Sequence, residues 1–186
     1  YVNRMKVIES IGEEKLCEEC EEMGIDLDKT LESYVAIPKT EDEVKLVERL
    51  TKEAVIKAVE RHAGKIRYIY GPSGRSTVAE GKDLTQVRWI IGTGGALTRL
   101  PNRVHIMEEI AKHNESGMLL FPSKHAKILV DNMYIMSSLG VLSMTHREGA
   151  IKLLEQTLGM SFEGKAPKAD DCLLYTSDAA DDSLRV

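Results

Sequence analysis

The chain has 186 residues, 42% of them apolar, which suits one domain of ordinary size with its own core and excludes two full-sized ones. Its 30 acidic residues outnumber 25 basic ones, the formal charge is −5 and only 5% of residues are aromatic, so the composition argues against a nucleic-acid partner. No apolar run is long enough to cross a bilayer, so we expect no membrane partner. Three cysteines do not make a disulfide scaffold, and we expect a protein of the reducing cytoplasm.

Residues 1–62 are predicted to form an acidic helical subdomain. The stretch 3–35 has helical periodicity and many glutamates, and Gly12 and Gly24 interrupt it. Thr40 and Glu43 have the spacing of a capping box, in which each side chain bonds the backbone amide of the other residue. An apolar stripe of period three to four follows and predicts one long helix that ends near His62.

Residues 63–162 are predicted to form an α/β unit, because the apolar period changes from helical to strand-like after Gly64. The turn 71–74 predicts a hairpin between its flanking strands. In chain order we expect strands at 66–70, 75–79, 87–91 and 127–130, a helix that contains Val104 and Ile110, and two further helices at 134–143 and 147–158.

Both ends of the chain look cut. Tyr1 runs straight into a helical pattern, as if an upstream part had been removed. Residues 163–171 are predicted to be a linker. Residues 172–186 match no earlier pattern and resemble a translated sequencing adapter, so we leave this tail out of the fold prediction.

Several possible motifs have simpler structural explanations. The run 71–77 follows a strand as a phosphate loop does, but it lacks the Gly-Lys pair and is predicted to be a hairpin turn. Cys17 and Cys20 supply half a zinc site at most, and neighbouring glutamates disfavour a reactive thiolate. The five histidines include no metal-binding i, i+4 pair, and no nucleophile elbow is present. We therefore predict no catalytic residue and no metal ligand in this chain.

The turn after the strand 87–91 is the strongest candidate for a binding site. It places Gly92, Gly94 and Gly95 at the carboxyl end of a strand, where bare backbone can approach a ligand closely. The spacing is not that of a dinucleotide fingerprint, and Lys112 stands where that motif needs an acidic residue. Taken alone, such glycines could equally serve a tight turn.

Longer runs around this turn resemble a known family. Residues 94–101 are similar to the adenosine motif of the actin, sugar-kinase and heat-shock-chaperone ATPase superfamily, with one extra residue before Arg99, and 131–140 resemble the Asp-and-small-residue helix that follows it. Within that superfamily, four runs resemble the glutamate-mutase MutL family, over nearly all of 1–162 but only the C-terminal part of a member. These runs are 61–64, 81–85, 90–97 and 134–143.

The resemblance implies a fold and a function. The fold would be the C-terminal lobe of an actin-like ATPase, a ribonuclease-H-like α/β fold with an N-terminal helical subdomain. The function would be that of an ATP-dependent accessory protein that reactivates an adenosylcobalamin-dependent mutase, with the mutase subunits as partners.

ATP or ADP would bind at Gly92, Gly94, Gly95 and Ala96, with Asp131 facing the ligand. Both Asp-Gly-x-Thr phosphate loops and the Mg²⁺ ligands would lie upstream of Tyr1. The whole protein would then be an ATPase, and this fragment would be inactive alone.

Two other functions remain open from the sequence. A small-molecule kinase of the same fold would share the adenosine motif, with its catalytic base in the absent part. An interaction module would bind no nucleotide at all. Nucleotide binding and mutase recovery distinguish the three possibilities.

Overall fold

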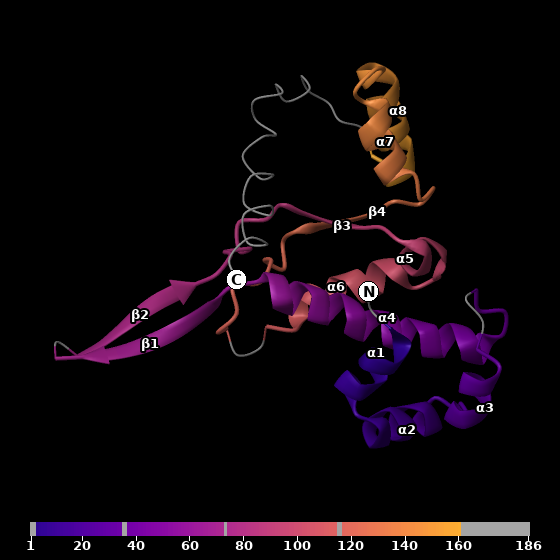
Figure 1. Cartoon of the computed structure of the whole chain (residues 1–186), viewed down its shortest axis with the longest axis horizontal. Coiled ribbons are helices and arrows are strands. Elements are labelled where there is room, and N and C mark those ends of the chain that lie inside the picture. The colour runs from indigo at the N-terminus through magenta and orange to yellow at the C-terminus, as the bar shows by residue number, and fades with distance from the viewer. Residues whose placement is uncertain (1–2, 35–36, 73, 115–116, 161–186) are drawn as a thin grey trace, which may run out of the picture.

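We describe residues 3–34, 37–72, 74–114 and 117–160 of a computed structural model, and the predicted linker and tail lie outside these ranges. The chain alternates helices with strands, which confirms the mixed α/β class (Figure 1). The elements are α1 (Arg4–Ile11), α2 (Glu13–Glu22), α3 (Leu27–Glu32), α4 (Glu41–His62), β1 (Lys65–Gly71), β2 (Gly74–Glu80), β3 (Trp89–Gly92), α5 (Gly95–Arg99), α6 (Arg103–Lys112), β4 (Lys127–Val130), α7 (Met136–Leu142) and α8 (Arg147–Leu158).

The front helices form where the sequence predicts them. Gly12 separates α1 from α2 with a φ of 92°, a conformation that costs glycine little. The predicted capping box is confirmed, because Thr40 Oγ1 accepts from the Glu43 amide at 3.2 Å and Glu43 Oε2 accepts from the Thr40 amide at 3.2 Å. The apolar sides of α1 to α3 pack on α4 around a first core that contains Leu16, Cys20, Leu46 and Leu50.

Helix α4 belongs to two cores. Leu46 and Leu50 face the first one, whereas Val47 packs in a second core with Ile106, Ile110 and other residues of α5 and α6. Ion pairs also anchor α4 to both sides, with Arg49 Nε 2.6 Å from Glu19 Oε2 in α2 and Lys52 Nζ 2.8 Å from Glu109 Oε2 in α6. The division predicted at residue 62 therefore falls at the end of a helix that both parts share.

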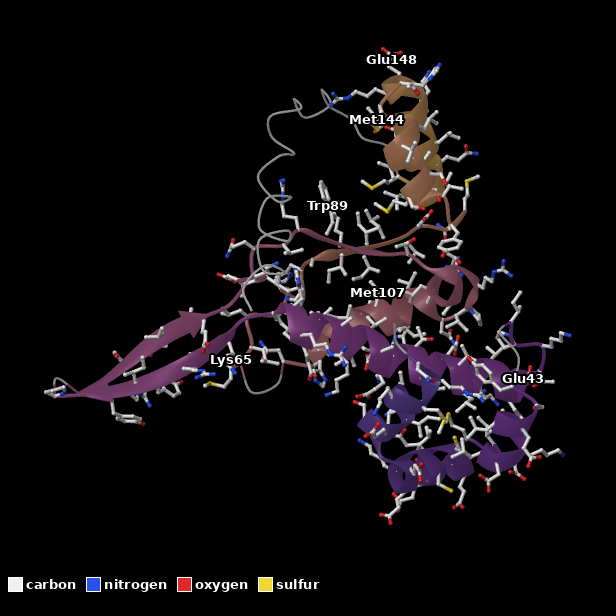
Figure 2. The ribbon with its side chains drawn as sticks, viewed as in Figure 1. Glu43, Lys65, Trp89, Met107, Met144 and Glu148 are labelled. Carbon is white, nitrogen blue, oxygen red and sulfur yellow. The ribbon has the colours of Figure 1, made fainter. Side chains whose placement is uncertain are left out.

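Strands β3 and β4 form a parallel pair in which Trp89 lies opposite Lys127 and Gly92 opposite Val130. Ile90 and Ile128 cover the second core, above Met107 of α6. Figure 2 shows Trp89 on the opposite side of this sheet from Met107. Trp89 is 41% exposed and Ile91 40%. Parallel sheets in proteins are normally covered on both faces, whereas Trp89 and Ile91 leave this face of the β3–β4 pair partly exposed.

Strands β1 and β2 form the predicted hairpin, which projects from the rest of the structure as an arm (Figure 1). Lys65 pairs with Glu80 at its base and Gly71 with Gly74 at its tip. The described helices include none long and apolar enough to cross a membrane.

Two glycines, Gly64 and Gly81, flank the strands of the arm and meet at its base. The Gly64 amide donates to the Lys82 carbonyl at 2.6 Å, and the Leu120 amide donates to the Gly64 carbonyl at 2.8 Å. A Cβ on Gly64 would lie 2.5 Å from the Glu80 carbonyl oxygen. Gly81 has a φ of 93°, and a Cβ there would lie 2.8 Å from the Gly64 Cα.

Gly64→Ala is expected to destabilise the fold by about 2 kcal/mol or more, because the added methyl group meets backbone that cannot move aside. Chemical denaturation followed by circular dichroism measures this loss. Gly71→Ala is the matched control, since a Cβ at Gly71 has no atom within 4 Å. Equal unfolding free energies for the two variants would show that the contact is not tight in solution.

Candidate functional site

The three glycines of the turn after β3 serve different purposes. Gly92 is buried, and a Cβ there would lie 3.2 Å from Met107 Sδ, so this position requires a small residue for packing. Gly94 has a φ of 108°, which disfavours any residue with a side chain. A Cβ on Gly94 or Gly95 would have no atom within 4 Å. The backbone is therefore accessible at Gly94 and Gly95 but not at Gly92.

An open cavity of about 350 Å³ lies beside this turn. Its walls come from three parts of the chain that are far apart in sequence: the front helices, α4 and the turn itself. The lining is mostly apolar and includes three residues that bear a hydroxyl group, Tyr34, Thr51 and Thr93. The lining residues are Arg4, Val7, Tyr34, Val47, Leu50, Thr51, Ala54, Val55, Thr93, Gly94, Gly95, Ala96 and Leu97.

One side of the cavity carries a stacked pair, Arg4 and Tyr34. The Arg4 guanidinium lies 4.7 Å from the centre of the Tyr34 ring, a cation–π distance. Arg4 is the charged member of the lining and, within the described residues, has no carboxylate at salt-bridge distance. The cavity thus combines apolar walls, bare backbone, three hydroxyl-bearing residues and one cation. This combination suits a small organic ligand with polar groups on one side.

Asp131 lies beneath the turn rather than in the cavity lining, and it is fully buried. Its carboxylate accepts four hydrogen bonds: from the hydroxyls of Thr93 at 3.0 Å and Thr157 at 2.6 Å, and from the amides of Ile135 at 3.2 Å and Met136 at 2.9 Å. Burial alone would raise the pKa of Asp131, but these hydrogen bonds, led by that from Thr157, hold its pKa below the usual value. Asp131 therefore fixes Thr93, and a direct contact with a ligand stays a prediction.

The structure brings Gly94, Gly95 and Ala96 together in one wall and places Gly92 and Asp131 behind it. Sequence reasoning missed Arg4, Tyr34 and the face of α4 as lining residues. Their local sequence pattern does not distinguish these residues from ordinary surface and core positions. About 40 to 90 residues separate them from the turn, so only the folded structure shows that they lie beside it.

The other sequence candidates lie elsewhere. Cys17 is exposed, whereas Cys20 is buried in the first core, where burial and then the neighbouring Cys17 and Glu19 raise the pKa of its thiol. Among the described residues, no three His, Cys, Asp or Glu side chains gather as metal ligands do. Of the run 71–77, Ser73 lies outside the described residues and the others form the end of the arm.

Comparison with known proteins decides the family. A family model described as "MutL protein" matches residues 1–158. The chain belongs to the MutL family. This confirms the resemblance inferred from the sequence runs. Protein MutL of Clostridium tetanomorphum is a MutL relative that is 34% identical over 122 residues, covering 66% of this chain and 26% of the relative. The match thus spans about a quarter of that MutL protein. No solved structure matches the chain.

Asp131→Asn is expected to lower the free energy of unfolding of this MutL-family chain by about 2 to 3 kcal/mol at neutral pH, because an amide cannot accept all four buried hydrogen bonds. A group whose pKa is lowered by folding stabilises above its unfolded pKa and loses this effect in acid. The difference between wild type and variant should therefore be constant near pH 7 and shrink below about pH 4.

Urea denaturation at several pH values measures this difference. Asp28→Asn, at an exposed site on α3, is the control and should change little. A loss at Asp131 no larger than that at Asp28 would contradict the role of the buried carboxylate.

Proposed function

We propose that this chain supplies the adenosine-binding part of an ATP-binding accessory protein that serves an adenosylcobalamin-dependent mutase, such as glutamate (methylaspartate) mutase. Membership of the MutL family supports the accessory role. One observation supports nucleotide binding: the backbone of Gly94 and Gly95 is accessible beside a largely apolar cavity. Because the chain spans about a quarter of the MutL relative, the function of the whole protein is part of the proposal.

The cavity has properties that suit the base and ribose of a nucleotide. Small-molecule pockets in proteins begin at about 300 Å³ and combine apolar walls with a few polar groups. The 350 Å³ cavity is at the lower end of that range, so we assign it the adenosine portion and not the whole triphosphate. Val47, Leu50 and Val55 would contact the base, and the hydroxyl of Thr51 would be available to polar atoms, whereas that of Thr93 donates to Asp131.

The phosphates and Mg²⁺ would be held by the rest of the longer protein. Phosphoryl transfer requires neutralisation of charge around the γ-phosphate and an oriented attacking group. The fold we propose is accordingly the C-terminal lobe of an actin-like ATPase, with α1 to α4 as its helical part. By itself, this chain would bind nucleotide without hydrolysing it at a useful rate.

Nucleotide binding would be coupled to the position of the front helices. Arg4 and Val7 of α1 and Tyr34 after α3 line the same cavity as the glycine turn. A ligand in the cavity would therefore contact both sides and favour their closure. In the proposed function the mutase responds to this closure and releases its damaged cobalamin in the cytoplasm.

Gly94→Val is expected to weaken ADP binding by at least tenfold, because its side chain would fill the space beside the turn and strain the backbone. Isothermal titration with ADP and with adenosine measures the affinity. Gly74→Val is the matched control, since Gly74 has a similar φ of 103° and open surroundings but lies in the arm. Equal ADP affinities for the two variants would overturn the nucleotide assignment.

The accessory role has its own test in the longer protein that contains this chain. Inactivated mutase should recover activity when that protein and ATP are added, and Gly94→Val should abolish the recovery. ADP formation that requires a small acceptor substrate, with no recovery of the mutase, would instead identify a kinase.

A further inference from the structure

The base of the arm brings together two sequence runs that the glycine-turn cavity does not use. Residues 61–64 end α4 and lead into β1, and residues 81–85 follow β2. They meet where the Gly64 amide donates to the Lys82 carbonyl and Ala63 bridges Lys82. The close approach of Gly64 and Gly81 leaves no room for a side chain between them. The backbone that carries the neighbouring side chains is therefore fixed.

A second cavity, of about 730 Å³, lies at this junction and shares no lining residue with the first. Its lining is rich in basic side chains that come from α4, from the first residue of β1 and from the segment after β2. Figure 2 shows Lys65 at the base of the arm, where that cavity lies. The lining residues are Glu60, Arg61, His62, Ala63, Gly64, Lys65, Glu80, Gly81, Lys82 and Leu119.

The two acidic side chains of this lining are already engaged with other residues. Glu60 lies 2.8 Å from Lys57 Nζ and 2.8 Å from His113 Nε2, neither of which lines the cavity. Glu80 Oε2 lies 2.6 Å from Arg67 Nε.

The basic side chains have no such partners. Within the described residues, Arg61, Lys65 and Lys82 have no carboxylate at salt-bridge distance. The cavity thus has a surplus of positive charge in a chain whose formal charge is −5.

Helix capping accounts for only part of this cluster. Arg61 and His62 lie in the last turn of α4, where cations stabilise the exposed carbonyls. Lys65 and Lys82 lie outside that helix, and the Gly64–Gly81 contact brings them to the same cavity. The side chains of Arg61, Lys65 and Lys82 are exposed, so solvent screens the repulsion between them, and an anion in the cavity would be attracted by all three.

We infer that the cavity at the base of the arm binds a small anion that carries phosphate groups. The Arg61 guanidinium can donate two parallel hydrogen bonds to phosphate oxygens, and Lys65 and Lys82 provide point charges beside it. A volume of about 730 Å³ lies within the range of small-molecule sites, and the apolar side chain of Leu119 offers a contact for a non-phosphate part.

Pyrophosphate is the probe for this site, with inorganic phosphate as a smaller one. Titration of the 186-residue chain, followed by amide NMR, should shift the resonances of Gly64 and Gly81 with saturation. Arg61→Gln combined with Lys82→Gln should weaken pyrophosphate binding by at least about tenfold, because charge-assisted hydrogen bonds are lost. Lys15→Gln combined with Lys152→Gln removes the same charge from exposed positions outside the lining and should leave the affinity nearly unchanged.

No saturable shift at Gly64 and Gly81, or equal weakening by the two double variants, would overturn the inference. Thermal unfolding of each variant checks that its fold is intact. Adenosine separates this site from the proposed nucleotide site, because it lacks phosphate and should shift only Gly94 and Gly95. Pyrophosphate binding without adenosine binding would support the basic cavity and contradict the adenosine assignment, and the reverse result would do the opposite.

Discussion

The buried carboxylate of Asp131 is the interaction on which the end of the β3–β4 sheet depends. Its own amide donates to the Gly92 carbonyl at 2.9 Å, so it joins the carboxyl ends of both strands. Its side chain then binds Thr93 on one side and the start of α7 and Thr157 of α8 on the other. A charge without contact with water requires this full set of donors. The position of the glycine turn therefore follows from a requirement of the interior, and the open backbone at Gly94 begins two residues after that fixed end.

The local structure could be predicted from the sequence because it follows from neighbouring residues. The Thr40–Glu43 box, the hairpin around 71–74 and the helices in the regions of α6 to α8 depend on contacts within a few positions, and the structure confirms them. The short helix α5 was missed because five residues give no measurable period. Tyr134, predicted within a helix, instead precedes α7 with a φ of 55°, since Asp131 sets where that helix begins.

The tertiary contacts of the site could not be predicted in the same way. The family resemblance implies that Asp131 faces the ligand, and this stays a prediction. Its partners Thr93 and Thr157 lie 38 and 26 residues away in the sequence, so the hydrogen bonds that bury it could not be predicted. Arg4 and Tyr34 reach the glycine turn only because α1 and α3 pack on α4. Such contacts depend on how whole helices and strands pack against one another, and the periodicity of a single sequence gives no information on that packing.

Helix α4 physically connects the cavity beside the glycine turn with the cavity at the base of the arm. Its 22 residues span roughly 33 Å, and it lines the first cavity with Val47 to Val55 and the second with Glu60 to His62. Because a continuous helix is stiff, a tilt at one end also moves the other end. If ligands bind at both cavities as proposed, a tilt of α4 that changed the wall of one cavity would also move the wall of the other. Thermodynamic reciprocity requires that any such influence have the same magnitude in both directions.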